Sequence, residues 1–195
     1  MQMTIFCDSG IPAIKMNFIF VSKKMMRDHY IQLAAFNVWA NKRICDFIAA
    51  NLTSEQIEKV LVSSFPSVRK TINHICDAEA IWLERLRGNL MNDWSEHRGE
   101  SFNEELTAFL EKSIALLEFL KAKNEAFISG NISYVHRSGI HYNEPASEIL
   151  THIINHSTFH RGQLIMMFRQ LGFTEGIPKT DFIAYAREIA AVKAP

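Results

Sequence analysis

The chain has no surplus of charge of either sign. Its 21 Lys and Arg residues equal its 21 Asp and Glu residues, so the formal net charge at pH 7 is +0. Proteins that bind nucleic acids usually carry a basic surplus that offsets the charge of the phosphates. We therefore expect a small-molecule substrate and no nucleic-acid partner.

Cysteine is scarce and shows no pairing pattern. Cys7, Cys45 and Cys76 form an odd, widely spaced set without a C-x-x-C motif. This spacing favours neither a disulfide framework nor a zinc site built from cysteines. Reduced thiols are typical of cytosolic proteins, so we expect a cytoplasmic location.

No apolar run is long enough to cross a bilayer. The stretch 11–21 (IPAIKMNFIFV) is interrupted by Lys15, follows no basic region and ends without a small-residue cleavage site. We expect neither membrane association nor a signal peptide. Residues 1–22 are interpreted as an N-terminal extension, either disordered or produced by a misplaced start codon, and residues 23–195 as one domain.

Glycine and proline are also sparse, and helical periodicity fills the remaining sequence. Apolar residues recur at steps of three and four, which predicts amphipathic helices. Capping-box patterns begin at Thr53 and at Ser101. Four long helices are predicted, together with a short helix from Thr53 and a final helix over 181–191; the long ones cover about 24–50, 66–87, 102–130 and 145–172.

The predicted fold class is all-α, because four long amphipathic helices with short connections pack as a four-helix bundle. The segment before the fourth helix (ISYVHRSGIHYNEP) holds β-branched and aromatic residues around Ser138-Gly139. That composition predicts a short hairpin.

Two histidines occupy inward positions of the fourth helix. A seam with steps of three or four runs along this helix: Ile149, Ile153, His156, His160, Gln163, Met167 and Leu171. Burial of an imidazole without a partner costs about 1–3 kcal/mol. Two successive buried imidazoles therefore need a compensating interaction, and histidines at i and i+4 direct two nitrogens toward one metal ion.

His152 forms a second i,i+4 pair with His156, but one ion cannot use all three side chains. His152 and His160 are about 12 Å apart along a helix axis. We choose His156 and His160 because both lie in the seam, and interpret His152 as a surface or packing residue.

A third ligand is expected from another helix, because metal sites generally have at least three protein ligands. His74 is the only histidine well inside the second long helix. It lies with Ala78 and Ile81 at the margin of the apolar stripe. This position suits a ligand that reaches sideways or a half-exposed surface histidine, and the residues alone leave both readings open.

Three segments resemble one known family. Residues 155–163 (NHSTFHRGQ) resemble the N-H-x-x-x-H-R-G-Q signature of the DinB-like (YfiT-like) metalloproteins, and residues 37–41 (NVWAN) are similar to its N-x-W-A-N pattern. Residues 67–86 look like the stretch around the family's first metal histidine. The tail DFIAYARE (181–188) resembles its closing helix, so the resemblance covers about residues 25–191.

This resemblance implies a four-helix bundle with a three-histidine site for one divalent metal, usually nickel or zinc. It places the ligands at His74, His156 and His160. It also implies a homodimer. Many members are described as metal-dependent hydrolases, whereas others are transferases or isomerases that use a low-molecular-weight thiol.

Four other polar residues are candidates for supporting roles. Asn37 is expected to hydrogen-bond a ligand imidazole or the substrate, and Asp77 to orient the second nitrogen of His74. Arg161 is expected to anchor a substrate carboxylate, and Gln163 to face the metal cavity. The alternative for each is an interhelical hydrogen bond or a surface charge pair.

Three functions are compatible with these residues. A metal-dependent transferase that uses a low-molecular-weight thiol is the leading hypothesis, and a metal-dependent hydrolase is the alternative. A non-catalytic bundle that binds a metal or a small molecule in a stress response is the third. No serine-histidine-aspartate set, phosphate loop or nucleotide fingerprint supports other classes.

Overall fold

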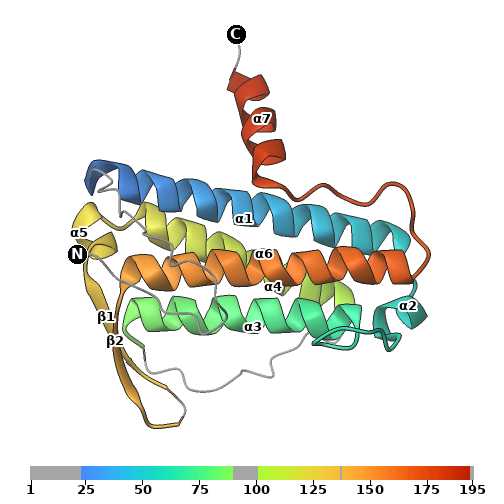
Figure 1. Ribbon diagram of the computed structural model, residues 1–195, viewed down its shortest axis with the longest axis horizontal. Helices are drawn as coiled ribbons and strands as arrows, with labels where there is room; N and C mark the ends of the chain where they lie inside the picture. Colours follow the sequence, from blue (N-terminus) through green and yellow to red (C-terminus); the bar gives the residue numbers. More distant parts are fainter. Residues whose placement is uncertain (1–22, 90–100, 137, 194–195) are drawn as a thin grey trace, which may run out of the picture.

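The computed structural model describes residues 23–89, 101–136 and 138–193. Its long helices lie side by side (Figure 1): α1 (Lys23–Asn51), α3 (Val68–Arg87), α4 (Phe102–Lys121) and α6 (Ala146–Gln170). The shorter elements are α2 (Ser54–Glu58), α5 (Glu125–Ile128), β1 (Asn131–Val135), β2 (His141–Pro145) and α7 (Phe182–Lys193). The predicted four-helix bundle with a hairpin and a C-terminal helix is confirmed. The extension 1–22 lies outside the described residues, so the domain division stays a prediction.

The four long helices run in two parallel pairs. In Figure 1, α1 and α6 run in one direction, whereas α3 and α4 run in the other. Contacts between matching ends agree with this arrangement. Arg69 and Glu105 form an ion pair of 2.8 Å between the first turns of α3 and α4. The Tyr30 hydroxyl on α1 donates a hydrogen bond of 2.9 Å to the carbonyl oxygen of Ser147 in the first turn of α6.

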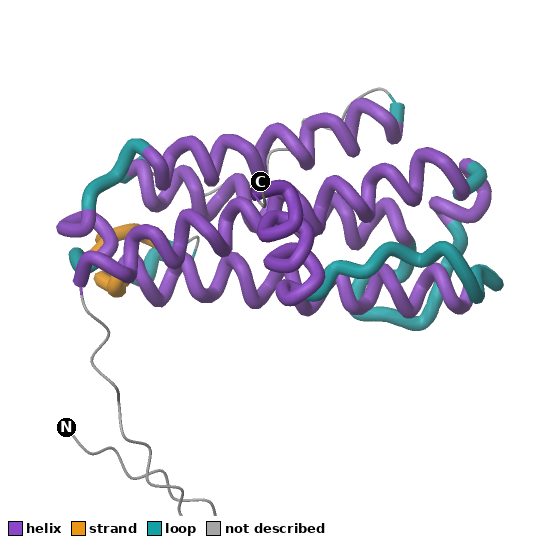
Figure 2. The backbone as a smooth tube through the Cα atoms, turned by 90° about the horizontal axis from the view of Figure 1, so that it is seen from above, coloured by secondary structure: helices purple, strands orange, loops and turns teal. Residues whose placement is uncertain are grey.

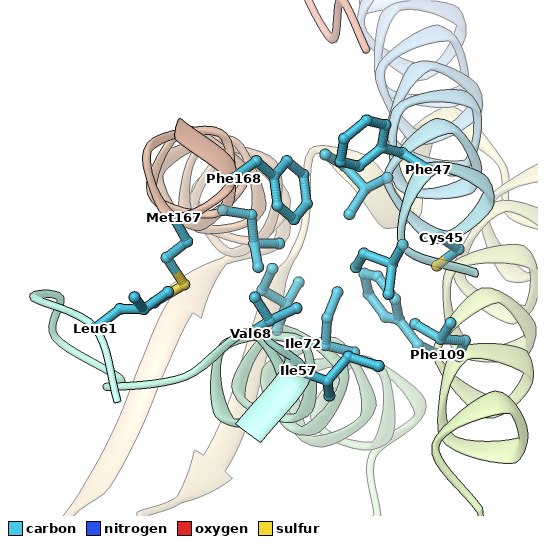
Figure 3. Packing of buried hydrophobic residues seen from close by; sticks show 14 residues of the cluster. Cys45, Phe47, Ile57, Leu61, Val68, Ile72, Phe109, Met167 and Phe168 are labelled. Carbon is cyan, nitrogen blue, oxygen red and sulfur yellow. The ribbon is translucent and has the colours of Figure 1, made fainter. Parts of the chain in front are cut away.

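Two apolar clusters fill the bundle, one toward each end. On every long helix, buried polar residues separate the residues of one cluster from those of the other. One cluster surrounds Ile48, Ile72 and Phe168 and is shown in Figure 3. The other surrounds Leu120 and Leu150. The buried polar residues between them are Asn37 and Asn41 on α1, Glu79 on α3, Ser113 on α4, and Ser157 and Arg161 on α6. This layer adjoins the two α6 histidines in sequence.

Local capping signals account for most helix boundaries. The capping boxes predicted at Thr53 and Ser101 are both present. Pro66 does not begin α3 as expected, because the side chain of Ser67 caps that helix by accepting a hydrogen bond from the backbone N–H of Lys70. The third long helix is shorter than predicted: it ends at Lys121, and Asn124 caps the separate helix α5.

The hairpin lies at one end of the bundle, as the view in Figure 2 shows. Its strands pair antiparallel, with Tyr134 opposite Tyr142. Gly139 adopts a positive φ of 82° in the connection, a conformation that favours glycine. Near the C-terminus, α7 projects from the side of the bundle in Figure 1. It contacts α1 through the packing of Tyr185 on Phe36.

None of the helices in the described segments is both long enough and apolar enough to cross a membrane.

Candidate metal centre

Three imidazoles from two helices converge at mid-bundle. One potential ligand atom from each of His74, His156 and His160 lies within 4.8 Å of the others. The Nε2 atoms of His74 and His156 are 2.9 Å apart, so one donates and the other accepts a hydrogen bond. The predicted convergence of α3 and α6 at these side chains is confirmed, and the sideways placement of His74 suits a ligand rather than an isolated surface histidine.

Gln163 holds the ring of His160. Its Oε1 accepts a hydrogen bond of 2.7 Å from Nδ1 of His160, and its Nε2 donates to Oγ of Ser64 at 3.0 Å. Because Nδ1 carries the proton, Nε2 of His160 has a free lone pair. Gln163 thus orients an imidazole in the way that outer residues of metal sites do, in agreement with its predicted position.

Burial keeps two of the imidazoles neutral. Burial and, to a lesser extent, the neighbouring His160 lower the pKa of His74 to about 4. The pKa of His156 falls to about 3, chiefly through burial and then through the three surrounding histidines, His160, His74 and His152. At neutral pH, His74 and His156 therefore present nitrogen lone pairs, the form in which histidine binds metals.

Two phenylalanines line the histidine cluster. Phe65, in the connection from α2 to α3, stacks on His74 with ring centroids 3.8 Å apart and meets the ring of His160 edge-on at 5.5 Å. Phe159 on α6 lies 5.0 Å from the ring of His160 and is 61% exposed. Sequence reasoning missed Phe65, because a residue in a connection belongs to no periodic stripe.

The other histidines lie outside this cluster. His152 is exposed on α6 and contacts the ring of Trp82 at 5.2 Å, which confirms its interpretation as a packing residue. His29 and His141 are exposed. His136 is half-buried and shares a hydrogen bond of 2.8 Å with Ser138 inside the hairpin turn. His97, interpreted as a surface residue, lies outside the described residues.

The structure places Arg161 and Asn37 in roles other than those expected. Arg161 is 1% exposed, and its guanidinium donates to Oδ1 of Asn37 at 2.6 Å and of Asn41 at 2.8 Å. A guanidinium enclosed in this way is not available to a substrate carboxylate. The side chain of Asn37 instead joins two residues of the buried polar layer: it accepts a hydrogen bond from Arg161 and donates one to Glu79. Both residues therefore form interhelical hydrogen bonds, the alternative considered from the sequence.

Glu79 is the acceptor at the centre of this buried layer, and sequence reasoning did not identify it. Its Oε1 accepts hydrogen bonds from the amide of Asn37 at 2.7 Å and from the hydroxyl of Ser157 at 2.9 Å. The amide of Asn41 donates to the same oxygen at 3.1 Å, and the hydroxyl of Ser113 donates to Oε2 at 2.6 Å. The available signal was a single carboxylate in the apolar stripe of α3, four residues from Ile75 and four from Leu83.

Asp77 lies half-buried on α3, three residues after His74. Its expected role in orienting His74 stays a prediction. Both His74 and Asp77 interact with other residues.

The donor set fits a divalent transition metal. Tetrahedral zinc with bonds of about 2.0–2.1 Å separates its ligand nitrogens by roughly 3.3 Å. The 2.9 Å separation of the His74 and His156 nitrogens and the 4.8 Å limit for the whole set are of this order. A site of three imidazoles, without a fourth protein ligand in the described cluster, is the composition of reactive rather than closed structural metal centres.

Comparisons with known proteins agree with this geometry. The DinB family model matches residues 25–190. "Protein DinB" of Bacillus subtilis (strain 168) is 27% identical over 168 residues, which cover 82% of this chain and 95% of that protein.

Two solved structures share the fold. A DinB-like protein from Bacillus cereus ATCC 10987 superimposes with a TM-score of 0.61 at 18% identity, over 78% of this chain and 95% of the other. YfiT from Bacillus subtilis gives a TM-score of 0.58 at 14% identity, over 82% and 94% of the two chains; it is described as a probable metal-dependent hydrolase with an unusual four-helix bundle topology. With the family model matched along nearly all of its described length, this chain belongs to the DinB family.

Proposed function

We propose that this protein is a divalent-metal-dependent enzyme that transfers a low-molecular-weight thiol to an electrophilic substrate. The convergence of His74, His156 and His160 within 4.8 Å carries the proposal. Three imidazoles suit nickel or zinc and leave a coordination position for a reactant.

His74, His156 and His160 would hold a divalent ion, which would lower the pKa of a bound thiol or water and so supply a nucleophile at neutral pH. Two surrounding residues orient and shield the imidazoles. Gln163 fixes the ring of His160 through Nδ1. Phe65 covers one face of His74 and reduces the access of water to the imidazoles.

The thiol comes from outside the protein in this proposal. Burial raises the pKa of both Cys45 and Cys76 to about 12, so neither thiol ionises near neutral pH. In the reaction, the sulfur of the external thiol forms a bond with an electrophilic carbon. The bond from that carbon to its leaving group breaks, the leaving group keeps the electron pair, and the thiol proton passes to solvent.

Hydrolysis is the second candidate function. It is supported by the description of YfiT, which shares this fold, as a probable metal-dependent hydrolase. The same three imidazoles serve either reaction, because water and a thiol use the same kind of open position.

One experiment separates these functions. Protein expressed without a histidine tag and loaded with nickel or zinc is incubated with monobromobimane, a thiol-reactive electrophile, and in parallel with p-nitrophenyl acetate. Each reaction is run with and without glutathione, cysteine or coenzyme A. We expect turnover of the electrophile that requires both metal and a thiol, and that is lost in His156→Ala but kept in His29→Ala, which removes an exposed histidine outside the cluster.

The other outcomes contradict the thiol-transfer proposal. Ester hydrolysis that needs metal but no thiol would identify the hydrolase instead. Stoichiometric metal binding without turnover of either substrate would support a bundle that only binds metal.

A further inference from the structure

Arg85 lies in an aromatic cluster at the hairpin end of α3. Its guanidinium carbon is 4.5 Å from the ring centre of Trp82 and 4.6 Å from that of Tyr134 on β1. The two rings meet edge-on, with centroids 5.4 Å apart. Cation–π contacts of this kind fix the orientation of a guanidinium but do not satisfy its N–H donors.

This arginine is half-buried and lacks an anionic partner among the described residues. Its Nε is buried without a hydrogen-bond partner there. Burial lowers the pKa of Arg85, whereas the nearby Tyr134 and Glu144 act in the opposite direction. Other half-buried arginines are paired; Arg69, for example, donates to Glu105 at 2.8 Å. A desolvated cation without a partner is costly, and a bound anion would offset that cost.

The carboxylates nearest to Arg85 are already engaged. Glu144 on β2 accepts a hydrogen bond of 2.6 Å from the hydroxyl of Tyr134. Glu84, the preceding residue, accepts from Arg87 at 2.6 Å and from Asn89 at 2.6 Å. Within the described segments, the donors of Arg85 are therefore left for a ligand.

The position of Arg85 relative to the histidines sets the size of that ligand. Arg85 follows His74 by 85 − 74 = 11 residues, which is close to three turns and places both on the same face of α3, about 16 Å apart along the axis. Side chains on a helix lean toward its N-terminus, so His74 and Arg85 lean in the same direction and keep about this separation. Ring contacts of Trp82 with His152 at 5.2 Å, and of His152 with His156 at 5.6 Å, form a continuous surface between them.

We propose that Arg85 binds a carboxylate of the reactant whose reactive atom lies at the three histidines. This inference rests on the proposed function and narrows it to reactants that carry a carboxylate several bonds from the reacting atom, within the separation of about 16 Å along the helix. The carboxylate belongs either to the thiol or to the electrophile, and the same guanidinium recognises both. Trp82 and His152 form the surface along which the reactant lies.

The test uses metal-free protein, so that its result does not depend on catalysis. At pH 8 and low ionic strength, isothermal titration calorimetry measures the binding of glutathione, a carboxylated thiol, and of 6-bromohexanoate, an electrophile whose carboxylate lies several bonds from the carbon that bears the leaving group. Glutathione diethyl ester, which lacks the carboxylate charge, is the ligand control. At this pH, His74 and His156 are neutral and do not attract anions, because their pKa values are about 4 and about 3.

The variants are Arg85→Gln and, as the matched control, Arg87→Gln, which removes an exposed arginine from the same helix. We expect binding of at least one carboxylated probe to weaken about tenfold or more in Arg85→Gln and to be unchanged in Arg87→Gln. The probe that binds more tightly identifies which reactant carries the carboxylate. Equal binding of glutathione and its diethyl ester would show that the carboxylate is not that of the thiol. Unchanged affinity of every probe in Arg85→Gln, or no binding of either carboxylated probe to the wild-type protein, overturns the proposal. Carboxylate binding through Arg85 in a protein without thiol-transfer activity would overturn only the proposed function.

Discussion

Ser157 donates a hydrogen bond of 2.9 Å to Glu79, and this bond joins α6 to α3 at the residue directly after His156. The same carboxylate accepts from α1 and α4. Glu79 therefore links all four long helices at the level where His156 and His74 meet. The register of α3 and α6 that brings His74 and His156 together is therefore also the register of the buried polar layer.

Removal of Glu79 should destabilise the fold strongly. In Glu79→Leu, the guanidinium of Arg161 stays buried with its carboxylate counterpart gone, which typically costs about 3–5 kcal/mol. The free energy of unfolding, measured by urea denaturation of the metal-free protein, should fall by this amount. Glu118→Ala removes an exposed carboxylate on α4 and should change it by less than about 0.5 kcal/mol.

The double variant Glu79→Leu, Arg161→Met should recover part of the lost stability. Removing both charges avoids an unpaired buried ion, so the two effects should not be additive. Additive losses in the double-mutant cycle would show that the two charges do not interact through Asn37 and Asn41.

Loss of one histidine of the cluster should abolish stoichiometric metal binding. His156→Ala leaves two imidazoles, below the usual minimum for a stable protein site, and the affinity for zinc or nickel should fall more than 100-fold, beyond the 10- to 100-fold typical of losing an outer partner. Elemental analysis and chelator competition measure the change. His152→Ala should still bind one equivalent; equal losses in both variants would argue against this ligand set.

Gln163 should tune the metal affinity without supporting the fold. In Gln163→Leu, the Nδ1–H of His160 loses its acceptor, and the zinc affinity should fall roughly 10- to 100-fold. The urea midpoint of the metal-free protein should change little. Ser64→Ala removes only the exposed end of the same hydrogen-bond chain. It serves as the control, and its metal affinity should stay close to that of the wild type.

The metal-free protein should lose stability as the pH falls below about 6.5. Unfolded histidines have their ordinary pKa near 6.5, whereas burial lowers that of His74 to about 4 and that of His156 to about 3. Between these values the unfolded state binds more protons, so acid favours unfolding. This stabilising contribution is complete above pH 6.5 and is lost progressively toward pH 4.

Urea midpoints at pH 7.5 and pH 5.5 measure this effect above the range in which most carboxylates titrate. The double variant His74→Gln, His156→Gln should show a smaller drop between the two pH values. A drop as large as that of the wild type would place the responsible groups elsewhere.

Much of the fold could be predicted because its signals are local. The Thr53 and Ser101 caps act within one helical turn, and both were correct. The seam of α6 likewise placed His156 and His160 on one inward face. The third long helix was predicted too long because its residues beyond Lys121 remain compatible with a helix, while Asn124 begins a new one.

The roles of polar residues were harder to predict because they depend on partners from other helices. Arg161 was expected to meet a substrate, since nothing near it in sequence reveals that the Asn37 and Asn41 amides enclose it. The only signal was the carboxylate of Glu79, which interrupts an otherwise apolar stripe. A carboxylate at such a position indicates a buried partner of opposite charge, and this partner is Arg161. Gln163 was placed correctly because its partner, His160, lies three residues away on the same helix.

The join between the hairpin and α6 limits how the protein can admit a reactant. Pro145 is both the last residue of β2 and the N-cap of α6, and the backbone N–H of Ala146 donates to the carbonyl oxygen of Gly130 at 2.9 Å. A flap needs hinge residues with free torsions, whereas proline fixes φ. Pro145 therefore restricts hinge motion at the point where the hairpin, which carries Tyr134 and Glu144, joins α6.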